Sequence, residues 1–249
     1  MKLRDAMAGG VHAVLHSEQV VARRFADVAA DQRTVYAKVK RHTMTSPERV
    51  LALCGAVDYV VARGVPGAVV ECGVWKGGSS MAVAYTLIAA GRTDRDLYLF
   101  DTFEGMTAPS EHDRRAADSA PAGDLLDAST VGDKIRCYSS LEEVRANMLA
   151  TGYPAKRVTY VRGKVEDTLP DRAPDQIAIL RLDTDWYEST RHELEHLYPR
   201  LSPGGVLIID DYGAWEGARK AVDEYFGARA APILLNRIDD TGRIGVKLG

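Results

Sequence analysis

The sequence predicts an α/β fold, with a mostly parallel sheet, helices on both faces and an antiparallel hairpin at the C-terminal end. From about residue 50 onward, short apolar runs alternate with longer helical patterns. Two acidic pairs, Asp183 with Asp185 and Asp210 with Asp211, follow two of these runs directly. Because ligands of open α/β sheets bind outside the carboxyl ends of the strands, these pairs indicate a candidate site.

The predicted helices are identified by caps, glycines and apolar spacing. The clearest begins after Thr45 or Ser46 as the cap, with Pro47 and Glu48 in its first turn, and ends near Gly64. The other predicted helices of this part of the chain are, in order, 77–90, 141–149, 187–201 and 214–226.

The predicted strands are short runs rich in valine, leucine and isoleucine, as expected for strands buried on both faces. In chain order they cover 68–71, 97–100, 158–161, 177–182 and 206–210. Two further runs, 233–235 and 243–246, predict the hairpin, with its turn at Asp239-Asp240-Thr241-Gly242.

Residues 1–46 are predicted to form a helical N-terminal extension or lid, and residues 47–249 one Rossmann-like domain. Within that domain, 107–134 holds six acidic residues against three basic ones and few large apolar groups. We expect this segment to be a mobile lid loop that orders over bound ligands. The alternative is a surface insertion without a role.

Composition excludes several classes of function. A net charge of −3 gives no basic field for nucleic acid. The three cysteines are widely separated and show no zinc-ligand spacing, which is typical of a reduced cytoplasmic protein. No apolar stretch is long enough for a membrane helix, and no signal-peptide pattern begins the chain. We expect a cytoplasmic homo-oligomer that binds neither nucleic acid nor membranes.

The four acids Asp183, Asp185, Asp210 and Asp211 would repel one another at one sheet edge. A hard divalent cation held by oxygen ligands relieves that repulsion, and Mg²⁺ suits a site that also keeps water or substrate oxygens. The alternative is that Asp210 and Asp211 cap the next helix while Asp183 makes an ordinary hydrogen bond.

A glycine-rich turn after the first predicted strand is the second candidate site. Gly73 is followed by Gly77 and Gly78, a spacing that matches neither GxGxxG nor a P-loop. Such a turn lets a ligand approach the backbone, and the helix start offers free N–H groups to a carboxylate. Asp101 ends the next strand, where an acid can bind a ribose diol. S-adenosylmethionine carries both groups.

These motifs resemble those of the macrocin O-methyltransferase (TylF-like) family over about residues 40–229. The matching segments are Glu71-Cys-Gly-Val-Trp-Lys-Gly-Gly, Phe100-Asp-Thr-Phe-Glu-Gly-Met, Leu182-Asp-Thr-Asp-Trp-Tyr-Glu-Ser-Thr, Leu197-Tyr-Pro-Arg-Leu-Ser-Pro-Gly-Gly and Ile209-Asp-Asp-Tyr. The resemblance implies a Rossmann-like class I methyltransferase fold, with S-adenosylmethionine and Mg²⁺ as cofactors.

The resemblance also implies roles for single residues. Asp183, Asp210 and Asp211 match the family's metal ligands, and Asp185 matches its general base. The positions that match cofactor-binding residues are Thr43, Met44, Glu71, Gly73, Ser79, Asp101, Phe103, Gly163, Val165, Glu166 and Asp183. For Asp185 the residues themselves leave an alternative, a helix N-cap with Glu188 as its capping-box partner.

The resemblance implies O-methylation of a deoxysugar hydroxyl, on a nucleotide sugar or a glycosylated natural product, in antibiotic or other secondary-metabolite biosynthesis. The acceptor itself stays open. Mg²⁺ would lower the pKa of a chelated hydroxyl, and a nearby carboxylate could take its proton. The alternatives are a metal-dependent hydrolase that uses the same carboxylates, a methyltransferase for a phenolic acceptor, and a catalytically silent protein of the same fold.

Overall fold

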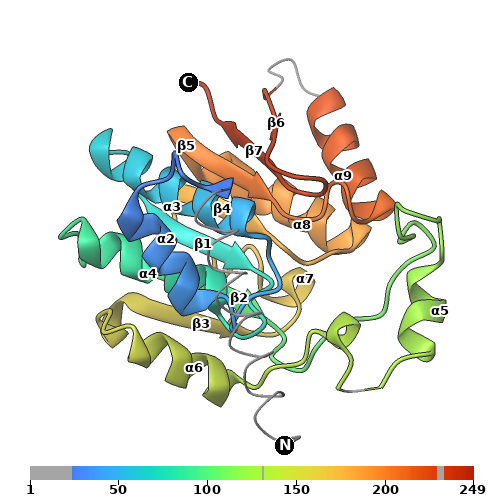
Figure 1. Cartoon of the computed structure of the whole chain (residues 1–249). Coiled ribbons are helices and arrows are strands. Elements are labelled where there is room, and N and C mark those ends of the chain that lie inside the picture. The colour runs from blue at the N-terminus through green and yellow to red at the C-terminus, as the bar shows by residue number, and fades with distance from the viewer. Residues whose placement is uncertain (1–23, 131, 229–232) are drawn as a thin grey trace, which may run out of the picture.

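The computed structural model describes residues 24–130, 132–228 and 233–249. Within them a central sheet has helices on both faces (Figure 1). Residues 1–23 of the predicted N-terminal extension lie outside the described residues, and its described part contains helix α2, Ala30–Val39.

Seven strands form one sheet in the order β3-β2-β1-β4-β5-β7-β6. The strands are β1 Ala68–Cys72, β2 Leu97–Asp101, β3 Val158–Arg162, β4 Ile177–Leu182, β5 Leu201–Ile209, β6 Asn236–Arg237 and β7 Arg243–Val246. The first five run parallel, and β7 is antiparallel to β5 and β6, as predicted. Strand order reverses between β1 and β4, which is where ligands of such sheets bind.

Helices cover both faces of this sheet. They are α3 Pro47–Ala62, α4 Gly78–Ala89, α5 Ala122–Asp127, α6 Leu141–Ala150, α7 Val165–Thr168, α8 Tyr187–Leu197 and α9 Glu216–Gly227, with short 3₁₀ turns at Lys134–Arg136, Ala155–Arg157 and Tyr198–Arg200. The predicted start of α3 is confirmed, since the Ser46 hydroxyl accepts the Arg49 N–H at 3.2 Å.

Alternate strand residues belong to two separate cores. Val69 and Ile179 pack with α3 and α4 on one face, whereas Val70 and Leu180 pack with α8 and α9 on the other. Because side chains alternate along a strand, both residue sets must be apolar for both faces to be buried. This explains why these strands read as continuous apolar runs.

Three regions differ from the prediction. The helix predicted to reach residue 201 ends at Leu197, where Pro199 shapes a 3₁₀ turn, and β5 begins at Leu201 instead of 206. The first hairpin strand is Asn236–Arg237, not 233–235. The predicted lid loop contains the short helix α5. In the first case, the start of β5 was missed because Ser202 is polar. Its hydroxyl donates to the Pro66 carbonyl instead of facing water, so a polar residue is accommodated in the strand.

Gly73 brings β1 against β4 where the site begins. Its φ is +81°, and a Cβ there would lie 1.9 Å from the Asp183 carbonyl oxygen. We expect Gly73→Ala to lower the free energy of unfolding by more than about 1–2 kcal/mol, the left-handed penalty alone, because of the added clash. Urea denaturation measures this change. The matched control is Gly55→Ala inside α3, where nothing lies within 4 Å; a gain of about 0.5–1 kcal/mol is expected. Equal effects of both substitutions would contradict the argument.

Candidate active site

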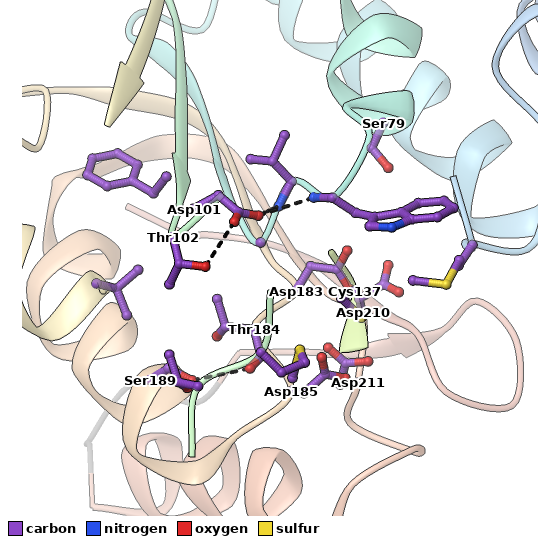
Figure 2. Close-up of a pocket in the computed structure, with 18 of the residues that line it drawn as sticks. Ser79, Asp101, Thr102, Cys137, Asp183, Thr184, Asp185, Ser189, Asp210 and Asp211 are labelled. Carbon is purple, nitrogen blue, oxygen red and sulfur yellow. Dashed lines mark hydrogen bonds between the residues drawn. The ribbon is translucent and has the colours of Figure 1, made fainter. Parts of the chain in front are cut away.

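A cavity of about 270 Å³ lies outside the carboxyl ends of β1, β2, β4 and β5 (Figure 2). Most of the predicted site residues line it: Thr43, Met44, Gly73, Ser79, Asp101, Gly163, Val165, Glu166, Asp183, Asp185, Asp210 and Asp211. Two others do not. Glu71 is buried beneath the cavity, where its carboxylate accepts bonds from Ser80 and Arg181. The Phe103 ring packs in the core, although its backbone N–H contacts Asp101.

Asp101 ties the glycine-rich turn to the end of β2. One of its carboxylate oxygens accepts the N–H groups of Val74 and Trp75 at 2.6 and 3.1 Å, and the other accepts the Phe103 N–H at 2.6 Å. Burial raises the pKa of Asp101, and these backbone bonds oppose the rise. Asp101 therefore fixes the backbone of the turn, besides lining the cavity next to Thr102.

Three acids meet at the other end of the cavity. Asp183 follows β4 and Asp210 and Asp211 follow β5, and one oxygen from each lies within 4.8 Å of the others. Neighbouring parallel strands end at the same edge, so residues far apart in the chain come together here. Within the described part of the chain, this is the group of side chains suited to hold a metal ion.

Two arginines that the sequence did not reveal hold two of these acids, Asp183 and Asp210. Arg181, on β4, donates to Asp183 at 2.7 Å and to Asp210 at 2.6 Å, and also pairs with Glu71. Arg49, on α3, pairs with the second oxygen of Asp210. The signal for Arg181 was present, because it is a charged residue inside an apolar strand. Arg49 gave no such signal, since charged residues are ordinary in a helix that is partly exposed.

The donor set fits a hard divalent cation. The site gathers more carboxylates than cations: Glu71, Asp183, Asp185, Asp210 and Asp211 against Arg49 and Arg181. The Oδ2 atom of Asp211 is buried and has no hydrogen-bond partner. Burial raises the pKa values of Asp183 and Asp211 well above their usual range. A buried, unpartnered carboxylate oxygen is costly unless a cation binds it.

Asp185 stands beside the acid triad in a left-handed backbone conformation, with φ of +66°. Burial and then the charge of Asp183 raise the pKa of Asp185 to about 7. The alternative role as the N-cap of α8 is wrong, because the cap position is Trp186 and no side chain of that turn caps the helix. A carboxylate with a pKa near neutrality is suited to take up a proton.

The helix α8 is capped instead from the predicted lid. Asp113 is buried, and its Oδ1 accepts the Tyr187 N–H at 2.7 Å. Backbone bonds from Ala116 to Ala214 and from Glu216 to Arg114 add to this contact. A small apolar cluster lies behind them, formed by Ala122, Leu126, Trp186, Trp215 and Ala218. Residues 107–127 are therefore docked beside the cavity, and Thr107 contributes to its wall.

Closure of the segment 107–134 over ligands stays a prediction. We expect amide hydrogen exchange across this segment to slow when methyl donor and acceptor bind, because closure would exclude water from the cavity. Exchange near Asp113 should already be slow without ligands, since its bonds to Tyr187 and Ser110 are formed. Identical exchange across the segment with and without ligands would support the surface insertion.

A mostly parallel sheet with this strand order, helices on both faces and a C-terminal antiparallel hairpin is the fold of class I O-methyltransferases. The O-methyltransferase NovP has the same fold: a TM-score of 0.72 and 33% identity, covering 84% of this chain and 83% of NovP. The predicted fold class is thus confirmed. The sequence model of the macrocin-O-methyltransferase (TylF) family matches residues 8–244, and the chain belongs to this family.

Two relatives support the assignment as an O-methyltransferase. The 8-demethyl-8-(2,3-dimethoxy-alpha-L-rhamnosyl)-tetracenomycin-C 4'-O-methyltransferase of Streptomyces olivaceus is 39% identical over 208 residues, which is 81% of this chain and 74% of the relative. The demethyldecarbamoylnovobiocin O-methyltransferase of Streptomyces niveus is 36% identical over 184 residues, which is 74% of this chain and 67% of the relative.

Among the described residues, no helix is both long enough and apolar enough to cross a membrane.

Proposed function

We propose that this enzyme transfers the methyl group of S-adenosylmethionine to a sugar hydroxyl of a glycosylated natural product, with Mg²⁺ held by Asp183, Asp210 and Asp211. The observation that carries the metal site is the buried Asp211 oxygen, which has no partner inside a cluster of repelling acids. Family membership supports the methyl transfer. Coordination by three carboxylates leaves positions for substrate oxygens on a cation of this kind.

Different residues of the cavity would bind the methyl donor, bind Mg²⁺ and accept the hydroxyl proton. Gly73 and the start of α4 suit the carboxylate end of the methyl donor, and Gly163 to Glu166 also line the cavity. When bound, Mg²⁺ would act as a Lewis acid that lowers the pKa of the acceptor hydroxyl. Asp185 would then receive the hydroxyl proton on its carboxylate. The methyl donor is already activated, so the remaining task is to align the acceptor oxygen with it.

The sugar acceptor is inferred from relatives. The Streptomyces olivaceus enzyme is named for a rhamnosyl-tetracenomycin, and a relative of Micromonospora griseorubida is a mycinamicin III 3''-O-methyltransferase. We extend the glycosylated type of substrate to this chain. A phenolic acceptor remains the second candidate for the same site. The hydrolase alternative lacks support, because the two arginines at the triad are engaged with carboxylates and the family transfers methyl groups. The homo-oligomer and the cytoplasmic location stay predictions.

Two experiments test the proposal. Calorimetry should give saturable binding of S-adenosylmethionine, and of Mg²⁺, to the purified protein. Mass spectrometry with glycosylated macrolides, nucleotide deoxysugars and simple phenols should then give a mass gain of one CH₂ unit, because methyl replaces the hydroxyl proton, for a sugar acceptor only. Methylation of phenols alone would overturn the sugar assignment, and full turnover in excess EDTA would overturn the metal.

Asp101→Ala should weaken S-adenosylmethionine binding by about 1.5–3 kcal/mol, the range for hydrogen bonds to a charged group. The reason is that Asp101 anchors the N–H groups of Val74 and Trp75 and also lines the cavity. Calorimetry measures the affinity, and the control is Asp94→Ala on the surface, where Asp94 pairs with Arg92. An unchanged affinity in the Asp101 variant would mean that the donor contacts neither this carboxylate nor the turn it holds.

A further inference from the structure

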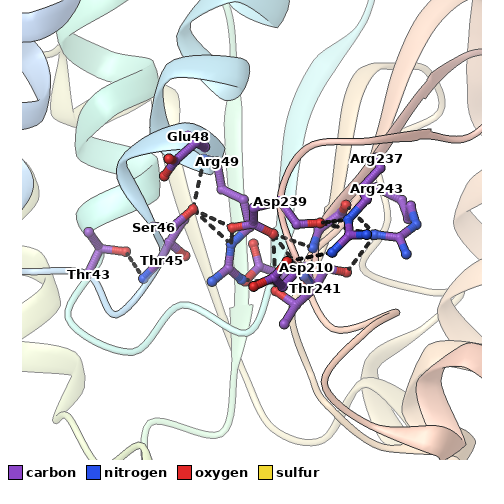
Figure 3. Close-up of polar contacts among 12 residues, drawn as sticks. Thr43, Thr45, Ser46, Glu48, Arg49, Asp210, Arg237, Asp239, Thr241 and Arg243 are labelled. Carbon is purple, nitrogen blue, oxygen red and sulfur yellow. Dashed lines mark hydrogen bonds and ion pairs between the residues drawn. The ribbon is translucent and has the colours of Figure 1, made fainter. Parts of the chain in front are cut away.

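The C-terminal hairpin turn reaches the acid triad through one arginine (Figure 3). Arg49, in the first turn of α3, pairs through Nη1 with Oδ2 of Asp210. Its Nε donates to Oδ2 of Asp239, in the turn between β6 and β7, at 3.0 Å. The Arg49 side chain is only 13% exposed, so one largely buried guanidinium joins a proposed metal ligand to the hairpin.

Asp239 is itself firmly held. Its Oδ2 also accepts the Ser46 hydroxyl at 2.5 Å. Its Oδ1 accepts the N–H groups of Thr241 and Gly242 at 3.0 and 2.7 Å, which closes the turn on itself. Each oxygen therefore has at least two donors, and the carboxylate faces Arg49 in a fixed direction.

Two glycines allow the turn to come this close. A Cβ on Gly242 would lie 2.7 Å from the Arg49 Cδ, and a Cβ on Gly213 would lie 2.1 Å from the Asp240 carbonyl oxygen. Gly213, two residues after Asp211, also donates its N–H to the Thr241 carbonyl at 2.9 Å. The hairpin turn is thus wedged between Arg49 and the loop that carries Asp210 and Asp211.

This arrangement has an electrostatic consequence. Arg49 is already paired with Asp210, so its positive charge would oppose the binding of Mg²⁺ to the same carboxylate. Asp239 offsets part of that positive charge and anchors the guanidinium on the side away from the triad. Without the Asp239 charge, Arg49 would act on Asp210 more strongly and would be less well oriented. The stronger Arg49 charge and the poorer orientation would both weaken Mg²⁺ binding.

We propose that Asp239 is a positioning residue for the metal site, acting through Arg49 on Asp210. This rests on the proposed function, because it presumes that the triad binds Mg²⁺. It assigns the C-terminal hairpin a role in cation affinity, beyond closing the edge of the sheet.

The test is Mg²⁺ affinity by calorimetry on the full-length protein carrying Asp239→Asn. Asparagine keeps an oxygen for the Thr241 and Gly242 amides and suits a turn, so the hairpin should persist. We expect Mg²⁺ affinity to fall about tenfold, the lower end for partners of metal ligands, while S-adenosylmethionine affinity without Mg²⁺ stays unchanged. The matched control is Asp240→Asn. That neighbour loses the same charge, but its side chain is 97% exposed and pairs with Arg237 at the surface, so Mg²⁺ affinity should not change.

A double-mutant cycle separates action through Arg49 from general loosening. In an Arg49→Gln background, Asp239→Asn should change Mg²⁺ affinity by less than about twofold. Arg49→Lys provides a second variant outside the turn. It keeps the charge but lacks the fork that bridges Asp210 and Asp239, so Mg²⁺ should bind more weakly.

Wild-type Mg²⁺ affinity in both Asp239→Asn and Arg49→Lys would overturn this inference and leave the metal site intact. An undiminished effect of Asp239→Asn in the Arg49→Gln background would also overturn it. Failure of the wild-type protein to bind Mg²⁺ would instead overturn the proposed function on which the inference rests.

Discussion

Asp211→Asn is expected to abolish methyl transfer and, at the same time, to stabilise the metal-free protein. The buried Asp211 carboxylate has an oxygen without a partner, and its pKa is raised by burial and by its neighbours Asp185 and Asp210. Removing its charge relieves that repulsion. It also removes an anionic ligand from the proposed cation site, where the lost Lewis-acid stabilisation of several kcal/mol corresponds to more than about 100-fold in rate.

Thermal unfolding in EDTA and initial rates in Mg²⁺ measure the two effects. We expect the melting temperature to rise by about 2–4 °C, the shift that about 1 kcal/mol produces in a chain of this length. Asp240→Asn removes the same charge at the surface and should change neither quantity. A variant that keeps wild-type activity would refute the role of Asp211 as a ligand. A lower melting temperature in EDTA would show that its charge is satisfied in the free protein.

Asp185→Asn should lower kcat by about 10²–10⁴-fold, the usual contribution of a general base. Asparagine is well suited to the left-handed backbone at this position, where φ is +66°, so the fold should persist. Asp185 is not one of the three proposed ligands, but its charge acts on Asp211. Mg²⁺ affinity should therefore fall far less than the rate, and S-adenosylmethionine affinity should stay close to that of the wild type. Pre-steady-state rates together with calorimetry separate these quantities.

Glu188→Gln is the matched control for Asp185→Asn. Glu188 is the exposed acid that the sequence offered as a capping partner, and its carboxylate pairs with Arg191 at the surface. Its substitution should leave kcat unchanged. If Asp185→Asn loses Mg²⁺ affinity as strongly as it loses rate, then Asp185 is a ligand and the base must be sought elsewhere.

Much of the cavity edge could be predicted from the sequence, because the sequence shows where the buried strands end. An apolar run that stops at an acid places that acid at the carboxyl edge of a parallel sheet, and this located Asp183, Asp210 and Asp101 without knowledge of the fold. The cap of α3 at Ser46 was equally local, since a cap depends on residues within one turn. Such features depend on short-range patterns that hold in any fold.

The residue that caps α8 could not be predicted from the sequence. The sequence offers Asp185 at the right spacing, but the bond comes from Asp113, which lies 74 residues before Tyr187. The lid segment was similar, because its few apolar side chains suggested that it could not pack. Leu126 and Ala122 nevertheless pack in one apolar cluster with Trp186 and Trp215, which come from other parts of the chain.

The sequence by itself determined the class of sheet, the order of its elements and the acids at its edge, because each follows from periodicity and from where a run ends. Only the tertiary structure decided which charges meet. Arg49 from α3, Arg181 from β4 and Asp239 from the hairpin converge on Asp210, or on its arginine partner, from positions up to 190 residues apart. Electrostatic energy depends on distance in space and on burial, and spacing along the chain encodes neither.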